Sequence, residues 1–194
     1  MPPHTAMRLP DHNLARVRHS RTRGFTLVEL LAVVAMIGVL SALAVVGFKK
    51  YMNSTRTADA RSLIGAIRIA EESYRAETLT YRSCGSSLTD WYPATPNGKK
   101  RHWSGWTSHA RYDDWRILNV TADSPTSFGF AIVAGAPGDK PPNTSTSLKP
   151  AWPSPTTEPW YVVQAAGDAD GDGTFSYLVS SSFNGEIYVE NDTE

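Results

Sequence analysis

A single carboxylate lies inside the most apolar stretch of this chain. Residues 25–48 form an apolar run of 24 residues in which Glu29 is the only charged side chain. An ionised side chain at the centre of a membrane helix costs about 2.5–3.5 kcal/mol on insertion scales. Glu29 therefore needs a charged partner or a function, unless it lies near the membrane interface and is solvated there.

The position of Gly24, just before the apolar run, indicates a cleavage that keeps the run in the product. About 20 helical residues span ~30 Å of hydrocarbon, so residues 25–48 are long enough to cross a membrane. A secretory signal differs, because its apolar core is shorter and its small-residue cleavage site follows that core. Cleavage after Gly24 would place an ammonium group on Phe25, four residues before Glu29. We expect the Phe25 ammonium of a neighbouring subunit to pair with Glu29, since an uncompensated buried charge is strongly unfavourable.

The hexapeptide G-F-T-L-V-E at residues 24–29, followed by the apolar run, resembles the N-terminus of type IV prepilins and of the related pseudopilins of type II secretion. In that family a membrane peptidase cuts after the glycine, the new N-terminal phenylalanine is N-methylated, and the glutamate is required for assembly. The resemblance implies processing between Gly24 and Phe25, N-methylation of Phe25, and an assembly role for Glu29. It also implies three kinds of partner: other pilins in a homo-oligomer or co-polymer, a prepilin peptidase/methylase, and an inner-membrane assembly platform.

The charges before the run predict the orientation of the chain in a membrane. Residues 1–24 carry five arginines against Asp11, a net charge of about +4. By the positive-inside tendency this leader stays cytoplasmic and the rest of the chain is exported. We therefore expect a single-pass inner-membrane precursor, and then a cell-surface pilus or a periplasmic pseudopilus. Because the whole chain is neutral, the mature chain has a net charge of about −4, which does not favour direct binding of nucleic acid.

The hydrophobic pattern predicts one long helix over residues 25–77. Its first half is apolar on all sides, whereas its second half has apolar side chains at steps of three and four, as in an amphipathic helix. On the polar face we expect Glu71 and Arg75 to form an i,i+4 ion pair. The predicted division of the chain is a leader at 1–24 that is removed, a transmembrane half-helix at 25–48, an amphipathic half-helix at 49–77, and a globular head at 78–194.

The head contains four short β-prone segments, which predict an antiparallel sheet. The dipeptide Asn184-Gly185 favours a two-residue hairpin turn between the last two. Residues 135–159 contain seven prolines and many Ser and Thr, which predicts an extended surface loop. The fold class is therefore α+β, with a long N-terminal helix packed on a small sheet. The predicted strands are 128–134, 160–165, 175–180 and 186–189.

Residues 78–127 connect the helix to the sheet and are rich in aromatic side chains. We expect their tryptophans to pack this segment onto the head; a binding surface is the alternative, because Trp and Tyr anchor interfaces. Cys84 is the only cysteine, so the chain has no intramolecular disulfide and must hold its C-terminal region in another way. We expect Cys84 to be a buried small apolar residue, with an intermolecular disulfide as the alternative.

An acidic loop near the C-terminus has the residue types of a calcium site. Asp168, Asp170 and Asp172 alternate, and Thr174 is placed to offer a backbone carbonyl, as in the first half of a calcium loop. The second half does not match, because Val179 stands where a bidentate glutamate is expected. The alternative is an ordinary acidic turn. Ca²⁺ is the one cofactor that the sequence suggests, and the resemblance supports it, because major pseudopilins have a C-terminal calcium site where pilins have a disulfide.

These patterns favour a structural subunit, not an enzyme. The main hypothesis is a subunit of a type IV pilus-like filament, used for motility, adhesion or DNA uptake, with a pseudopilin of type II secretion as the alternative. A hypothesis of another class is a membrane-tethered, calcium-dependent binding domain that does not polymerise. A tethered enzyme is disfavoured, because no nucleophile–base pair and no metal-ligand spacing is evident.

Overall fold

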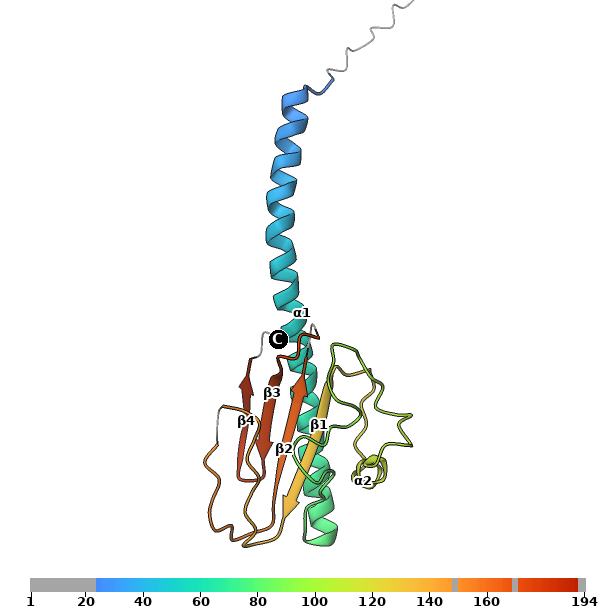
Figure 1. The fold of residues 1–194 in the computed structure, drawn as a ribbon, viewed down its shortest axis with the longest axis vertical. Coiled ribbons are helices and arrows are strands. Elements are labelled where there is room, and N and C mark those ends of the chain that lie inside the picture. The colour runs from blue at the N-terminus through green and yellow to red at the C-terminus, as the bar shows by residue number, and fades with distance from the viewer. Residues whose placement is uncertain (1–23, 148–149, 169–170, 192–194) are drawn as a thin grey trace, which may run out of the picture. The chain divides into compact units, whose positions relative to one another are not determined.

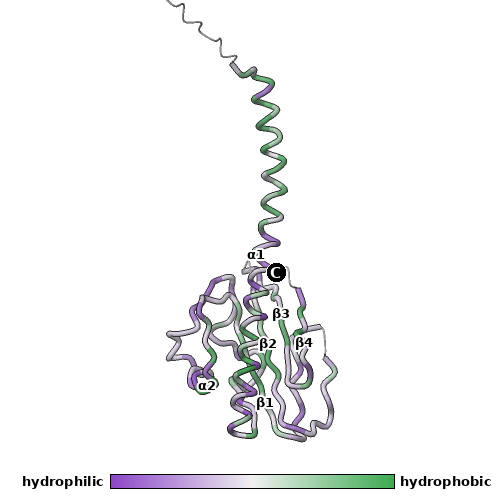
Figure 2. Tube along the Cα trace, turned by 180° about the vertical axis from the view of Figure 1, so that it is seen from behind, coloured by the Kyte–Doolittle hydropathy of each residue, from purple (hydrophilic) through white to green (hydrophobic). Residues whose placement is uncertain are grey.

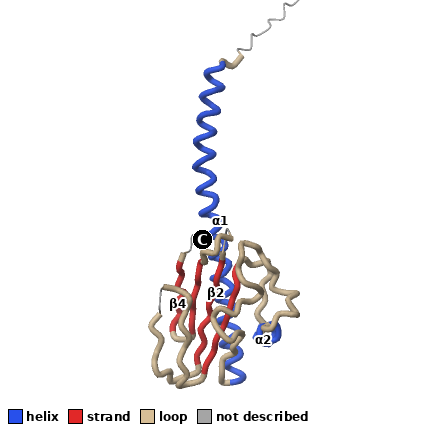
Figure 3. Tube along the Cα trace, viewed as in Figure 1, coloured by secondary structure: helices blue, strands red, loops and turns tan. Residues whose placement is uncertain are grey.

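A computed structural model of the chain describes residues 24–147, 150–168 and 171–191. It contains a helix of 52 residues, α1 (Leu27–Thr78), a short helix, α2 (Tyr112–Leu118), and one sheet of four strands (Figures 1 and 3). The described residues belong to two compact units, one ending at Leu43 and the other beginning at Ala44. The strands are β1 (Phe128–Gly135), β2 (Trp160–Gly167), β3 (Ser176–Ser181) and β4 (Asn184–Glu190).

Helix α1 confirms the predicted long helix to within two residues at each end. Every residue from Gly24 to Tyr51 is exposed, and an 18-residue window of the helix has a mean hydropathy of 2.7 with none of it buried. Figure 2 shows most of this stretch in the hydrophobic range of its colour scale. The helix ends where Leu79 takes a left-handed conformation (φ 63°) and donates its N–H to the carbonyl of Arg75 at 2.8 Å. By length and composition, α1 can therefore cross a membrane.

The sheet is antiparallel in the order β1-β2-β3-β4, and the α+β prediction is confirmed. The second half of α1 runs along one face of it (Figure 1). Alternate residues of β2 point to this face, as the two-residue period of a strand requires. The core between the helix and the sheet contains Ala60, Ile64 and Ile67 of α1 together with Phe130, Ile132, Tyr161, Val163, Ala165 and Leu178.

The opposite face of the sheet is also covered, and this explains why every residue of β2 is buried. Trp160 and Val162 of β2 form a second apolar cluster that includes Trp152 from the proline-rich loop. The buried Gln164 side chain fixes the same loop, because its Oε1 accepts the Ser145 N–H at 2.8 Å and its Nε2 donates to Ser145 Oγ at 2.9 Å. The predicted surface loop is mostly exposed, as expected, and it also covers part of this face of the sheet.

The predicted hairpin turn is displaced by two residues. Asn184 and Gly185 lie inside β4, and the turn is formed by Ser182 and Phe183. Tertiary contacts outweigh the local Asn-Gly preference here. The Ser182 N–H donates to the Tyr161 carbonyl, and the Tyr161 N–H donates to Ser182 Oγ, both at 3.1 Å. The Phe183 ring stacks on Trp160 at 6.3 Å between centroids, so the turn is anchored on both sides.

The connecting region 78–127 packs onto the head through its aromatic residues, as predicted. Trp103 and Trp115 are buried with their rings 5.0 Å apart, and the Tyr92 hydroxyl donates to the Trp103 carbonyl at 2.8 Å. Helix α2, which carries Trp115, was not predicted, since its seven residues are too short for a periodic signal. It lies beyond β1, on the side of the head away from β4 (Figure 1).

Two glycines give opposite expectations for stability. A Cβ added at Gly167 would lie 2.5 Å from the Phe128 ring, whereas one added at Gly65 in α1 would have no atom within 4 Å. We expect Gly167→Ala to lower the free energy of unfolding by about 1–3 kcal/mol through overpacking. Gly65→Ala should raise it by up to about 1 kcal/mol through helix propensity.

The measurement is urea unfolding of the full chain in detergent micelles, followed by tryptophan fluorescence. Equal effects of the two substitutions would contradict the close contact between β2 and Phe128.

Candidate functional site at the start of the helix

The residues predicted to carry processing and assembly lie at the N-terminus of α1. Thr26 precedes the first helical residue, and its N–H and its hydroxyl both donate to Glu29 Oε2 at 2.8 Å. In return, Thr26 Oγ1 accepts the Glu29 N–H at 3.2 Å. This reciprocal arrangement is a capping box, which satisfies free N–H groups at a helix start. Glu29 is therefore bound within its own chain, and Thr26 is a site residue that the sequence analysis missed although the T-x-x-E spacing signals it.

The capping box leaves the rest of the site accessible. Both bonds from Thr26 fall on Oε2, so the other carboxylate oxygen, Oε1, is not used by Thr26, and the Glu29 residue is exposed. Phe25 is 85% exposed, and its backbone nitrogen is the atom that would become the ammonium after cleavage. The site thus presents a carboxylate oxygen and a potential cation on one helix end. A second copy of the chain can contact both.

The large apolar surface of α1 next to this site requires covering. Side chains such as Leu31, Val34 and Ile37 are more than half exposed, on all sides of the helix. Removing apolar surface from water contributes roughly 25 cal/mol per Å². Lipid or the helices of other subunits are the two environments that satisfy this surface.

The acidic loop is described only in part, because Asp170 lies outside the described residues. Asp168 is buried, and its carboxylate accepts the N–H groups of Gly171 at 2.6 Å and Gly173 at 3.2 Å. Both glycines have positive φ, 82° and 89°, as such a turn requires. Asp168 is therefore already used in shaping the turn.

The other predicted calcium ligands show the same local role. Asp172 Oδ1 accepts the Thr174 N–H at 2.6 Å. In the described part of the chain, no three His, Cys, Asp or Glu side chains are grouped as a metal site. Because Asp170 is not described, the calcium site stays a prediction.

The C-terminal strand is held without a disulfide. Cys84 is fully buried, and its burial raises the pKa of the thiol. Glu190 of β4 accepts the N–H of Ser147 at 2.8 Å and also binds the Ser147 hydroxyl. Ser176 Oγ donates to the Asn191 carbonyl at 3.0 Å, which ties β3 to the residue after β4. Hydrogen bonds to the proline-rich loop and to β3 thus hold the end of the sheet.

A buried acid in α1 corrects the predicted surface ion pair. Glu71 is completely buried, and desolvation raises its pKa from 4.5 to about 8. Arg75 instead donates to the Tyr81 hydroxyl at 2.9 Å and pairs with Glu158 at 3.2 Å. The i,i+4 spacing was compatible with a pair, but the chain that follows the helix folds back over Glu71 and excludes water from it.

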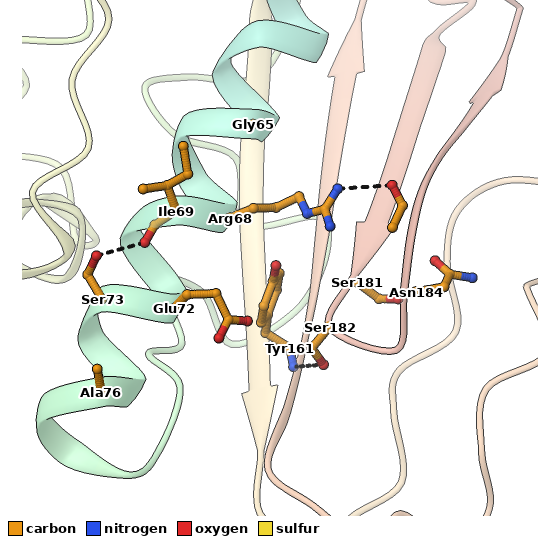
Figure 4. A pocket seen from close by; sticks show the side chains of 11 residues that line it. Gly65, Arg68, Ile69, Glu72, Ser73, Ala76, Tyr161, Ser181, Ser182 and Asn184 are labelled. Atoms are coloured by element: carbon orange, nitrogen blue, oxygen red, sulfur yellow. Dashed lines mark hydrogen bonds between the residues drawn. The ribbon is translucent and has the colours of Figure 1, made fainter.

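A groove of about 930 Å³ lies between α1 and the β3–β4 hairpin (Figure 4). Arg68 extends across it and donates to the Gly185 carbonyl at 3.0 Å. Its lining contains one acid, Glu72, and no histidine or cysteine.

Comparison with known proteins agrees with the site. A family model described as the prokaryotic N-terminal methylation motif matches residues 19–45. The type IV major pilin protein PilA of Myxococcus xanthus is 27% identical to the chain, over 87% of the chain and 84% of that protein. No solved structure matches the chain significantly.

Further relatives match mainly through the N-terminal part. The type IV major fimbrial protein FimA of Dichelobacter nodosus is 39% identical over 76 residues, which is 37% of the chain and 49% of that protein. A fimbrial protein of Pseudomonas aeruginosa is 43% identical over 51 residues, 26% of the chain and 33% of that protein. The chain thus spans between a third and a half of these two relatives. The methylation motif and the similarity to these pilins and fimbrial proteins support the type IV pilin family for this chain.

The capping box predicts a local effect of substitutions at Thr26. Thr26→Val removes the hydroxyl, and loss of such a cap costs about 1 kcal/mol. We expect amide exchange at Glu29 and Leu30 to become about fivefold faster, because 1.4 kcal/mol corresponds to roughly tenfold. Thr26→Ser keeps the hydroxyl and should leave the exchange rates near those of the unsubstituted chain.

The measurement is hydrogen exchange by NMR on the full chain in detergent micelles. Unchanged rates in the valine variant would show that the capping box does not stabilise this turn.

Proposed function

We propose that the chain is a structural subunit of a type IV pilus-like filament and has no catalytic role. The observation that carries the proposal is the exposed apolar half of α1, with Glu29 as its only charge, directly after the matched methylation motif. Among the described residues such a surface has no partner, and repeated copies of the same helix can cover it. The similarity to a type IV major pilin over most of the chain supports the proposal.

The proposed assembly begins with a membrane precursor. The basic leader at 1–24 keeps the N-terminus in the cytoplasm, and a prepilin peptidase/methylase cuts between Gly24 and Phe25 and methylates Phe25. An assembly platform in the inner membrane then transfers the subunit from lipid to the filament. Other pilins are the expected neighbours, and the cell surface is the expected final location.

Glu29 sets the register of the proposed filament. In lipid the carboxylate is held by Thr26 through Oε2, and on assembly its other oxygen pairs with the Phe25 ammonium of a neighbouring subunit. The pair forms only when the two helices have the correct axial offset. A subunit in another offset leaves both charges uncompensated in apolar surroundings, which is strongly unfavourable.

A pseudopilin of type II secretion is the second candidate function. The free, buried Cys84 favours it, since a C-terminal disulfide is excluded. The predicted Ca²⁺ site at Asp168, Asp170, Asp172 and Thr174 belongs to this hypothesis. A membrane-tethered, calcium-dependent binding domain shares the Ca²⁺ site but leaves the apolar half of α1 without a filament partner.

Calcium dependence tests the Ca²⁺ site that the pseudopilin and the tethered binding domain share. If the acidic loop binds Ca²⁺, millimolar Ca²⁺ should raise the unfolding temperature of the full chain in micelles, and a chelator should reverse the rise. Asp172→Asn should reduce the response, and Glu158→Gln, distant in sequence, should preserve it. An unfolding temperature that does not change with Ca²⁺ would contradict the calcium prediction and remove this support for a pseudopilin.

Substitution of Glu29 tests the proposed assembly. Glu29→Ala should leave cleavage after Gly24 intact but give few or no filaments, because breaking a buried pair costs about 3–5 kcal/mol per subunit. Glu72→Ala, at an exposed carboxylate in the head, is the matched control and should assemble normally. Processing is measured by mass spectrometry of the membrane fraction, and assembly by the yield of sheared filaments. Normal filaments from Glu29→Ala would refute the pairing.

A further inference from the structure

The inward face of α1 ends in a carboxylate where an apolar residue would be expected. Its buried positions are Thr57, Ala60, Ile64, Ile67 and Glu71, at steps of three and four. Glu71 is 0% exposed. Its Oε2 accepts the Arg82 N–H at 2.9 Å, and its Oε1 is buried without a hydrogen-bond partner among the described residues. A buried carboxylate with a single hydrogen bond is poorly solvated by the protein.

The surrounding charges do not compensate Glu71. Its nearest cation is Arg82, whose guanidinium pairs with Asp114 of α2 at 2.6 Å and whose Nε is itself buried without a partner in the described structure. The other titratable groups that interact with Glu71 are acids or neutral at ordinary pH. They are Glu72 on α1, Cys84 on the segment after the helix, and Tyr161 on β2.

Glu71 holds the segment that connects the helix to the rest of the head. After α1 the chain folds back, and Arg82 contributes its N–H to Glu71. Two further bonds secure the same segment: the Tyr81 hydroxyl donates to Glu72 at 2.8 Å, and the Cys84 N–H donates to the Ile132 carbonyl at 3.1 Å. We call residues 81–84 the return segment. Through the Arg82–Asp114 pair, the return segment is also linked to α2.

We propose that Glu71 holds the return segment on α1 only while its carboxyl group is protonated. While the carboxyl group is protonated, it can be buried at low cost and the segment stays docked on α1. When it ionises, the docked state must bury a charge with one hydrogen bond, and the segment opens locally to let water reach the carboxylate. The sheet keeps its own hydrogen bonds and stays folded. Alkaline conditions thus loosen the connecting region that carries Trp103 and Trp115.

The direction and size of the effect follow from linkage. The docked state binds a proton more tightly than the open state, because burial raises the Glu71 pKa from 4.5 to about 8. Docking of the return segment is therefore strongest below about pH 4.5. It weakens as the pH rises from about 4.5 to about 8. Between about pH 6 and about pH 8 the population of the open state should increase some tens of fold.

Hydrogen exchange on the full chain in detergent micelles tests the proposal. Peptides that cover residues 81–84 and 112–118 should exchange some tens of fold faster at about pH 8 than at about pH 6, after division by the intrinsic rate at each pH. Peptides from β2 should keep their protection. In Glu71→Gln this pH dependence should disappear, and in the matched control Glu77→Gln, at an exposed carboxylate of the same helix, it should remain.

Two results would overturn the proposal. One is the same pH dependence in Glu71→Gln as in the unsubstituted chain, which would assign the effect to another group. The other is loss of protection in β2 together with the return segment, which would indicate global unfolding and not local opening of that segment. If Glu71→Gln does not fold, the unsubstituted chain alone still tests the proposal. Corrected exchange rates of residues 81–84 that are the same at the two pH values would contradict it.

Discussion

The exposed apolar half of α1 is the constraint on which the rest of this protein depends. No segment of the described structure covers residues 27–48, and their surface requires lipid or other helices. The one carboxylate in this surface, Glu29, has a different free energy in lipid and among other helices. Within its own chain Glu29 is bound by Thr26, whereas in the proposed filament a neighbouring ammonium also pairs with it. In that proposal the polar pair provides the geometric specificity that apolar packing lacks.

The head solves a different problem, which is to stabilise a small sheet on half a helix without a disulfide. The apolar seam of α1 covers one face of the sheet, and the proline-rich loop covers the other. Gln164 and Glu190 fix that loop through hydrogen bonds to Ser145 and Ser147. The tryptophans of the connecting region then close the side of the core next to β1. Hydrogen bonds of polar side chains therefore take the place of a covalent link at the C-terminal end.

Sequence patterns were sufficient where a strong period or a dense motif acted locally. The helix bounds followed from an uninterrupted apolar run and an amphipathic stripe, and the strands from β-prone segments between turn residues. Sequence patterns gave wrong predictions where contacts between residues distant in the chain determine the structure. The turn at Ser182 and Phe183 depends on Tyr161 and Trp160, which lie some twenty residues earlier in the chain. Likewise, Glu71 looks exposed by spacing and is buried because the return segment crosses it.

The most direct test is mass spectrometry of filaments sheared from cells that express the gene at native level. We expect abundant filaments built from a chain that begins at N-methylated Phe25. Processed protein that is found only in the membrane or periplasm would favour the pseudopilin. A chain that keeps residues 1–24 and forms no filaments would contradict the account, because the Phe25 ammonium that pairs with Glu29 would not exist.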